Sequence, residues 1–524
     1  MDFLWLRDRG LSVLFENDEI IAVDKPYGLD THTNEAKDGQ ADFIQPGLIE
    51  LFEKQRGPLH VVHRLDRTTS GVIVFAKTLE AAKKYQGFFR ARETKKTYLF
   101  ITASDLKTAN RSHTGASLTC DAPIIRNGSA LEASTDFKRL AVTDDFALWV
   151  ATPHAGRNHQ IRIHAGTLGL PLLGDEKYGG EKFPFICLHN RRIEFPNGVV
   201  IESNPPVWFE NLELLKDERY IKALFEIDRR NRLFANSARC LRWVHPKTNG
   251  LDYALDLFDS HVVLSWYGER WSETDEKMFE RLAESVGRKL LVKFMAPKLK
   301  ASAESVPLAT RWTVLEGEIK HQLRMDSGQA PGLFLDQRLQ REWVRENSKG
   351  KTVLNLFSYT GGFSVAAVMG GATAVASVDS NKSMLNWARE NFALNGLDAD
   401  AHTFLCRDVV TFLDQAVSKA VKFDIVVCDA PSFSRSEKGL FKIEVELENL
   451  IKKSVELLAP GGELLFSLNA ESIFVDDVRR TVLKIKKDLK LSKLEISSVQ
   501  PSLDFELPGE APGLKSFLIS SISF

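Results

Sequence analysis

The sequence is poor in cysteine and has no long apolar run, and both shortages exclude whole classes of protein. Only 5 of 524 residues are cysteine. Their number is odd and no two form a CxxC pair, which argues against a disulfide framework or a structural zinc site. A membrane span needs about 18 consecutive apolar residues, and no run in the sequence is that long. The start of the chain also lacks the features of a signal peptide. We therefore expect a protein of a reducing compartment, the cytoplasm, with no membrane partner.

Charge of one sign is not in excess either. Lys and Arg together number 69, and Asp and Glu together number 70. A nucleic-acid partner would therefore be met by local basic clusters and not by a positive field over the whole protein. The 12 histidines do not cluster at metal-ligand spacing, so we expect no metal.

The chain changes character along its length and divides into four segments. Short apolar runs between Gly and Asn turns, such as EIIAVDKPYG and SGVIVFAK, dominate residues 1–213 and predict a mixed, mostly antiparallel sheet. Residues 214–230 read as a helical linker, and 231–328 as a small α/β module that is a candidate for RNA binding. Strands and helices alternate over 329–524, as in a Rossmann-like doubly wound sheet. The predicted fold class is multidomain α+β and α/β.

The first segment holds acidic and aromatic residues inside basic surroundings. In VVHRLDRTTSG, Asp66 lies between Arg64 and Arg67, directly ahead of a turn. A guanidinium close to a carboxylate favours its ionised form, which a nucleophile or base needs at neutral pH. In FFRARETKKTYLF, four basic residues precede Tyr98. Both stretches suit an active site that works beside nucleic acid.

A third stretch, GRNHQIRIH, alternates polar and apolar residues. Gln160, Arg162 and His164 are separated by single isoleucines. In a strand, alternate side chains share one face, so we expect these three polar groups to point the same way.

These stretches resemble the motifs of RluA-type pseudouridine synthases. HRLDRTTSG matches that family's H-R-L-D-x-x-T-S-G, KKTYLF its K-x-Y element, and GRNHQIRIH with LPLLGDEKYGG its G-R-x-H-Q-I-R and G-D-x-x-Y-G elements. AVDKPYGL resembles its opening D-K-P-x-G-L. The motifs occur in the right order over the first part of the chain, which makes the match specific. The resemblance implies a catalytic domain that begins almost at Met1 and isomerises uridine to pseudouridine in RNA without a cofactor.

The resemblance also implies roles for the matched residues. Asp66 would start the breakage of the glycosidic bond, either as a nucleophile or by taking a sugar proton. Tyr98 would stack on the flipped-out base, and Arg162 would pair with Asp66 and hold it in place. Further residues are expected to bind the RNA substrate through its phosphates or base edges. They are Arg64, Arg67, Lys95, Lys96, Arg157, His159 and Gln160.

The last segment places acids at successive strand ends. KTVLNLFSYTGGFSV reads as a buried strand, a loop with two glycines and a helix whose start favours an anionic group. The next predicted strand ends at Asp379, about 20 residues on, where an acid that holds ribose hydroxyls is expected. Asp408 and Asp429 follow the next two strands. Open α/β sheets bind ligands at this carboxyl edge.

These features resemble class I S-adenosylmethionine-dependent methyltransferases. GLFLDQR followed by VLNLFSYTGGFSV resembles, more narrowly, the RlmI/RlmK-type methyltransferases of large-subunit ribosomal RNA. The resemblance covers about residue 231 to the end and implies S-adenosylmethionine as cofactor, with Asp379 on its ribose and Asp408 on its adenine amine. The other residues expected to bind the cofactor are Ser358, Tyr359, Thr360, Gly361, Gly362 and Asp429. Those expected to bind the methyl acceptor are Pro431, Ser432, Phe433 and Asn469. The alternative, an NAD-binding fold, is disfavoured because GxGxxG spacing is absent.

The few cysteines bear on which atom is methylated. Methylation of cytosine C5 requires a thiolate that attacks C6. Cytosine-methylating relatives carry that cysteine where this sequence has Leu468 or, in another group, Ser432. Cys428 and Cys406 are expected in the core. The acceptor is therefore expected to be a nitrogen, and FSLN and DAPSFS resemble the branch that methylates guanine N7. That atom loses no proton on methylation, so alignment with the methyl group would supply most of the catalysis. Ala430 replaces the first proline of the related D-P-P motif, so an exocyclic amine stays open.

Together the two halves predict a bifunctional RNA-modifying enzyme acting on 23S rRNA or a large-subunit precursor. Tethering would raise the effective concentration of each half at neighbouring target bases. Two alternatives stay open. In the first, only one half is active on RNA, and the methyltransferase acts on an exocyclic amine, a cytosine or a non-RNA substrate. In the second, one half has no activity and only binds RNA.

Overall fold

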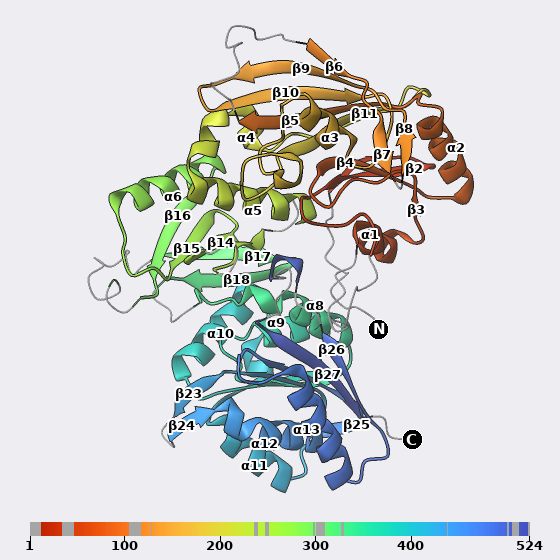
Figure 1. The fold of residues 1–524 in the computed structure, drawn as a ribbon. Helices are drawn as coiled ribbons and strands as arrows, with labels where there is room; N and C mark the ends of the chain where they lie inside the picture. Colours follow the sequence, from red (N-terminus) through yellow and green to blue (C-terminus); the bar gives the residue numbers. More distant parts are fainter. Residues whose placement is uncertain are drawn as a thin grey trace. The chain divides into compact units, whose positions relative to one another are not determined.

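The chain is described by a computed structural model and forms two compact units (Figure 1). The first lies within Arg9–Ser237, and the second comprises most of residues 238–524. None of the helices in the described ranges is long and apolar enough to cross a membrane. The structure describes residues 12–33, 47–103, 117–126, 128–234, 239–246, 251–296, 299, 310–325, 330–436, 439–499, 502–505 and 513–521.

One large sheet is the frame of the first unit. Its strand order is β1-β2-β4-β11-β5-β10-β9-β6, with β12 beside β11 and β3 beside β4. The pair β4–β11 is parallel, and the other described pairs are antiparallel, as predicted. A separate hairpin joins β7 (Ile124–Arg126) to β8 (Ser129–Leu131). The strands of the large sheet are β1 (Val13–Glu16), β2 (Ile20–Lys25), β3 (His60–Val61), β4 (Ser70–Ala76), β5 (Lys95–Ala103), β6 (Ser117–Cys120), β9 (Thr135–Val142), β10 (Phe146–Pro153), β11 (Leu188–Glu194) and β12 (Val200–Glu202).

Strand β4 shows why the sequence folds this way. Its run SGVIVFA is buried at every position, as a continuous apolar run of strand length predicts. Gly71 lies where β11 approaches closely, because a Cβ there would lie 2.2 Å from the carbonyl oxygen of Asn190, and its φ is +105°. A larger residue cannot occupy this position. The glycine therefore fixes the path of the chain as it leaves the Asp66 turn.

Helices of the first unit pack around this sheet. Thr78 caps α2, since its side chain accepts a hydrogen bond from the Ala81 amide. The helices are α1 (Leu48–Arg56), α2 (Leu79–Arg90), α3 (Gln160–Thr167), α4 (Val207–Glu210) and α5 (Glu218–Phe234), with short 3-10 turns at η2 (Glu176–Tyr178) and η3 (Leu212–Lys216).

The stretch expected as a strand is helix α3, so that expectation is wrong. A helix turns about 100° per residue, so residues four apart share a face and residues two apart do not. Gln160 and His164 accordingly both contact the hydroxyl of Thr135, at 3.0 and 2.9 Å. Arg162 instead contacts Asp175. The β-branched isoleucines favour a strand locally, but packing against β9 and β10 overrides that preference.

The segment expected as a linker belongs to the first unit. Helix α5 buries Ile221 and Ala223 completely. Its Arg232 forms an ion pair with Asp24 of β2, with 2.5 Å between Nη1 and Oδ2. These contacts make α5 part of the first unit's packing and not a free connector.

The second unit begins with a small α/β module. A sheet of order β13-β14-β15-β16 packs with α6, and β17 and β18 form a hairpin. Ser272 and Asp275 form a capping box at the start of α6. The elements are β13 (Cys240–Val244), β14 (Tyr253–Phe258), β15 (His261–Trp266), α6 (Glu273–Ser285), β16 (Lys289–Phe294), β17 (Arg311–Glu316) and β18 (Ile319–Arg324).

A second sheet follows, with strand order β21-β20-β19-β22-β25-β27-β26. Its first five strands are parallel, and β27 is antiparallel to both β25 and β26. The predicted parallel doubly wound sheet is confirmed. The strands are β19 (Thr352–Leu356), β20 (Ala374–Asp379), β21 (Thr403–Cys406), β22 (Phe423–Ala430), β25 (Leu458–Leu468), β26 (Leu494–Val499) and β27 (Lys515–Ser521), with a hairpin of β23 (Phe433–Ser436) and β24 (Gly439–Lys442).

Helices cover both faces of this sheet. Apolar residues of α11, α12 and α13 form one core cluster with the strands, and those of α8 and α9 form another. Asn381 caps α10, whose predicted inner residues Leu385, Ala388 and Phe392 are buried. The helices are α8 (Arg338–Asn347), α9 (Gly362–Met369), α10 (Lys382–Leu394), α11 (Val409–Ser418), α12 (Ile443–Glu456) and α13 (Val475–Asp488), with 3-10 turns at η6 (Leu335–Gln337), η7 (Ala399–Ala401) and η8 (Leu503–Phe505).

The two cysteines expected in the core differ. Cys428 on central strand β22 is fully buried, as predicted. Cys406 is exposed, so that expectation is wrong. It ends β21, which is an edge strand with a single neighbour in the sheet. Strands β20 and β19 lie between it and β22, so Cys406 is also far from the expected methyl-acceptor side.

Candidate active sites

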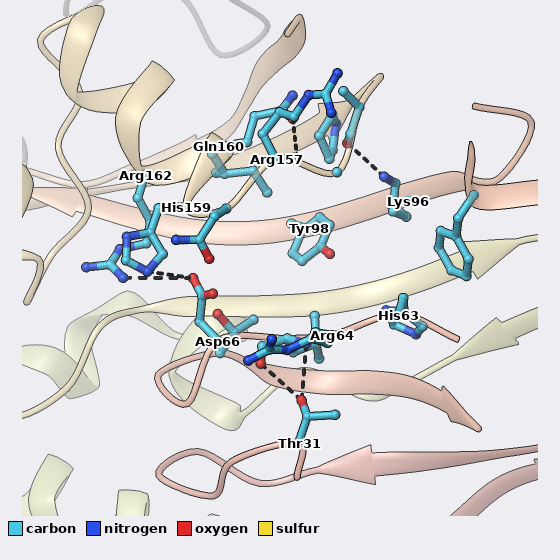
Figure 2. Close-up of a pocket in the computed structure, with 18 of the residues that line it drawn as sticks. Thr31, His63, Arg64, Asp66, Lys96, Tyr98, Arg157, His159, Gln160 and Arg162 are labelled. Atoms are coloured by element: carbon cyan, nitrogen blue, oxygen red, sulfur yellow. Dashed lines mark hydrogen bonds and ion pairs between the residues drawn. The ribbon is translucent and has the colours of Figure 1, made fainter. Parts of the chain in front are cut away.

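A cleft of about 1180 Å³ in the first unit brings the predicted residues of that half together (Figure 2). They reach it from the Asp66 turn, from β5 and from the loop that leads into α3. The predicted residues that line this cleft are Arg64, Asp66, Arg67, Lys96, Tyr98, Arg157, His159, Gln160 and Arg162. Predicted Lys95, also on β5, is exposed and is not among the lining residues.

Backbone contacts hold the Asp66 turn in place. The Thr69 amide donates to the Asp66 carbonyl at 3.0 Å. The buried Lys25 donates its Nζ to the Thr69 carbonyl at 2.7 Å. Burial lowers the pKa of Lys25 to about 7. The sequence predicts no role for this lysine, although a charged residue that closely follows the apolar run IIAV is a signal that it has a specific partner.

Arg162 makes its short contacts with Asp175 and not with Asp66. Its Nε and Nη2 donate to the two carboxylate oxygens of Asp175 at 2.6 and 2.7 Å. The distance from its Nη1 to Asp66 Oδ2 is 3.8 Å. Asp175 is thus the residue that orients the guanidinium toward Asp66. Asp175 lies in the G-D-x-x-Y-G element, but the sequence alone predicts no role for this residue.

His159 is a second group at the Asp66 carboxylate. Its Nε2 lies 3.7 Å from Asp66 Oδ2, and its Nδ1 lies 2.8 Å from the hydroxyl of Tyr178. The backbone of His159 is left-handed, with φ +55°, where the loop turns into α3. Burial lowers the pKa of His159, against the pull of the Asp66 charge. A neutral imidazole there can accept or donate a hydrogen bond.

The remaining cleft residues divide into an aromatic wall and a basic rim. Burial and the charge of Asp66 raise the pKa of Tyr98, which keeps its ring uncharged. Arg64 and Arg67 are exposed at the rim. Lys96 differs from the expectation of a phosphate ligand, because it is buried and donates to the Ala155 carbonyl at 2.8 Å.

Two polar residues of the α3 loop contact each other. Arg157 donates its amide to Gln160 Oε1 at 3.1 Å. The Gln160 amide group in turn donates to the Ser134 carbonyl at 2.9 Å. The side chain of Gln160 therefore shapes the loop, while Nε of the Arg157 guanidinium donates to the Glu132 carbonyl at 3.3 Å.

In the second unit, the glycine loop between β19 and α9 has an unusual backbone. Phe357, Tyr359 and Gly361 have φ values of +55°, +49° and +77°. A Cβ at Gly361 would lie 2.7 Å from the Cβ of Ala388. The hydroxyl of Ser358 is buried and has no hydrogen-bond partner. A strained loop with an unsatisfied buried hydroxyl is typical of a ligand site.

The Thr360 hydroxyl ties this loop to a neighbouring segment by donating to the Gly332 carbonyl at 2.7 Å. Gly332 is required there, because a Cβ would lie 2.4 Å from the Trp387 ring. Gly362 begins α9 directly after the loop. The loop is therefore held on both sides before any ligand binds.

Asp379 and Asp408 lie at the ends of their strands, as predicted. The two oxygens of Asp379 accept amides of Tyr359 and Asn381 at 2.9 and 2.8 Å, and burial raises its pKa. Each carboxylate oxygen has lone pairs left for a ribose hydroxyl. Asp408 caps α11 by accepting the Thr411 amide at 3.0 Å. The loop, its unsatisfied hydroxyl and these acids fit S-adenosylmethionine.

Asp429 near the end of β22 has two partners that sequence reasoning did not name. Gln337 donates its Nε2 to Asp429 Oδ1 at 2.7 Å. Burial, and next the charge of Asp336, raise the pKa of Asp429 to about 7. Both partners lie in the GLFLDQR stretch, which was read only as a family signature. Gln337 and Asp336 thus both act on the Asp429 carboxyl group, one through a hydrogen bond and the other through its charge.

The other predicted acceptor residues follow Asp429 and β25. The Ser432 hydroxyl donates to the Asn469 carbonyl, which joins the two loops that carry Pro431 and Asn469. Phe433 is 69% exposed, so its ring is available for stacking. Leu468, in the place of the cytosine methyltransferase cysteine, is fully buried.

Comparisons with known proteins agree with both halves. Residues 277–519 match the S-adenosylmethionine-dependent methyltransferase family, and residues 19–166 match the RNA pseudouridylate synthase family. The chain is 33% identical over 275 residues to ribosomal RNA large subunit methyltransferase K of Neisseria meningitidis, covering 47% of this chain and 77% of that protein. It is 42% identical over 158 residues to ribosomal RNA large subunit methyltransferase K/L of Shewanella sp. MR-4, covering 30% of this chain and 22% of that protein.

The fold is similar to the crystal structure of SMU.776 complexed with SAH, with a TM-score of 0.50 and 24% identity over 67% of this chain and 89% of that chain. The chain spans most of the Neisseria relative but only about a fifth of the Shewanella relative. The sequence matches carry the assignment, and the structural likeness supports the fold. This chain belongs to the S-adenosylmethionine-dependent methyltransferase family, whose cofactor its second unit uses, and joins that domain to an RNA pseudouridylate synthase domain.

Proposed function

We propose that the chain modifies large-subunit ribosomal RNA twice, forming a pseudouridine with its first unit and N7-methylguanosine with its second. The observation that carries the first activity is the meeting of Asp66, Tyr98, Arg162 and His159 in one cleft. The names of the Neisseria and Shewanella relatives support ribosomal RNA as the substrate.

The first reaction breaks the bond between the sugar and uracil N1 and forms a bond between the sugar and uracil C5. C5 loses a proton, and N1 gains one. Asp66 is the carboxylate at the sugar, and Arg162 stays oriented toward it because Asp175 holds the guanidinium. A uridine in a stem must be flipped out, and the ring of Tyr98 replaces the lost stacking. Arg64 and Arg67 are exposed, which supports contacts of these two residues with the flanking phosphates.

The second reaction is proposed at guanine N7 because the acceptor side offers no thiolate for cytosine C5 and because N7 loses no proton, so that alignment suffices. Leu468 replaces the required cysteine, and burial raises the pKa of the Cys428 thiol. S-adenosylmethionine supplies a methyl group on a positively charged sulfur. Guanine N7 carries a lone pair, while the opposite edge of the base presents N–H donors. We propose that the carboxyl groups of Asp336 and Asp429 accept those donors and that Phe433 stacks on the base.

Purified protein tests both activities on ribosomal RNA from cells that lack it. With methyl-labelled S-adenosylmethionine, mass spectrometry of digested RNA is expected to show label in N7-methylguanosine and a newly formed pseudouridine. Ribosomal RNA that already carries the modifications is the control and takes up no label. Label in 5-methylcytosine, in an exocyclic amine, or in no nucleoside would contradict the proposed methyl acceptor.

The pH dependence of methyl transfer tests the role of the carboxyl pair. An acid whose pKa is raised is neutral below that pKa, so Asp429 gains the charge that accepts N–H donors only as the pH rises through about 7. We expect kcat/KM for methyl transfer to rise over that range. Asp336→Asn removes a like charge, so the midpoint is expected to move to lower pH. An unchanged midpoint in pH-rate profiles of the two proteins would contradict this role of Asp336.

A further inference from the structure

A second cavity, of about 240 Å³, lies beside the catalytic cleft. Hairpin β7–β8, helix α3 and the turn η2 surround it. Its volume is about eight times the space of one water in the liquid, which is room for a single ring system and far less than the cleft offers. The residues from Gly156 to His159 line both spaces, so these residues form the wall between them.

The lining of this cavity suits a nucleobase attached to a phosphate backbone. Apolar and aromatic side chains line it together with cations, and no Asp or Glu lines it among the described residues. The side chain of Ile125, which lines the cavity, is 67% exposed, so a bound ligand could cover it. The apolar and aromatic residues include Ile125, Leu131, Ile163 and Tyr178, and the cations are Arg126, Arg157 and Lys177.

Tyr178 and His159 connect the cavity to the reacting carboxylate. The Tyr178 hydroxyl lies 2.8 Å from His159 Nδ1, and His159 Nε2 lies 3.7 Å from Asp66 Oδ2. The guanidinium of Arg162 also lies over the Tyr178 ring, 5.1 Å from its centre. One aromatic ring therefore contacts the cavity and both groups that approach Asp66. A base against this ring would steady them.

We propose that this cavity binds the base of the nucleotide next to the target uridine and so helps to select which uridine is modified. The inference rests on the proposed pseudouridine activity of the first unit. The short path through His159 fits two consecutive nucleotides, one in each space. The cations at the cavity are placed to meet the phosphates that flank the second base.

The test uses the full-length protein and a short RNA around the uridine that the protein modifies in ribosomal RNA. Versions of this RNA lack the base on the 5′ or the 3′ side of the target, leaving the sugar and phosphates. Stacking on a protein surface contributes enough that we expect one deletion to lower kcat/KM for pseudouridine about tenfold. Ile163→Trp fills the cavity and is expected to lower kcat/KM on intact RNA by a similar factor. On the RNA that lacks the sensitive base, the same substitution is expected to cause little further decrease in kcat/KM.

Leu79→Trp is the matched control, because Leu79 is 67% exposed and lies at the start of α2. It is expected to keep wild-type rates, and the wild-type rate of a variant on the RNA that lacks the sensitive base reports that its first unit is intact. Leu131→Trp fills the cavity from β8 if Ile163→Trp does not fold. Equal rates on all three RNAs with the wild-type protein would overturn the proposal. Absence of any pseudouridine with the wild-type protein would overturn the proposed activity, and this inference with it.

Discussion

Asp66→Asn is expected to lower pseudouridine formation by about 10³-fold, in the range that loss of a general base or nucleophile costs, while methyl transfer keeps its wild-type rate. Asparagine keeps the size of the side chain but not its charge or basicity. The bonds that hold the turn use backbone atoms, and Asp175 still holds Arg162. The cleft should therefore keep its shape and lose only its reacting group.

The measurement is the initial rate of pseudouridine formation in ribosomal RNA from cells that lack the protein. Asp144→Asn is the matched control, since Asp144 is exposed in the turn between β9 and β10. It is expected to retain the wild-type rate. A loss of less than tenfold in Asp66→Asn would mean that another residue of the cleft starts the reaction.

Asp379→Ala is expected to have the opposite effect, with methyl transfer lost and pseudouridine formation kept. Its carboxylate accepts two amides of the cofactor loop and is proposed to accept two ribose hydroxyls. Hydrogen bonds to a charged group contribute about 1.5–3 kcal/mol each. Loss of two such bonds raises the Kd for S-adenosylmethionine about 100-fold or more.

Calorimetric titration with S-adenosylmethionine measures this change directly. Asp400→Ala is the control, because Asp400 forms an exposed ion pair with Arg389 at 2.8 Å, and such pairs contribute little. Its Kd is expected to match that of the wild type. Wild-type affinity in Asp379→Ala would place the ribose elsewhere, and loss of pseudouridine in the same variant would show that the two units depend on each other.

Much of the fold could be predicted because local sequence and packing agree. The buried run of β4, the capped helix α10 and the alternation of β19, α9 and β20 each show one unbroken pattern. The short helix α3 was missed because its polar residues alternate as in a strand. Only contacts with Thr135 and Asp175, distant in the sequence, explain that spacing.

The residues of the candidate sites could be predicted from motifs, but the contacts between their side chains could not. Asp66 and Arg162 were found, while the closer partner of Arg162 is Asp175. Asp429 was found, while its contact with Gln337 joins residues 92 positions apart. Periodicity and motif spacing describe one segment at a time, so they do not reveal which distant side chains meet. The same holds for Cys406, whose exposure follows from the place of β21 at the sheet edge.

The central claim is that one chain makes two separate modifications of ribosomal RNA. The most direct test is mass-spectrometric mapping of ribosomal RNA. The cells are a deletion strain that lacks the chain, and the same strain expressing the wild type, Asp66→Asn or Asp379→Ala. We expect ribosomal RNA of the deletion strain to lack one or more pseudouridines and an N7-methylguanosine. Asp66→Asn is expected to restore only the methyl group, and Asp379→Ala only pseudouridine. Unaltered ribosomal RNA in the deletion, or loss of both modifications with either variant, would contradict it.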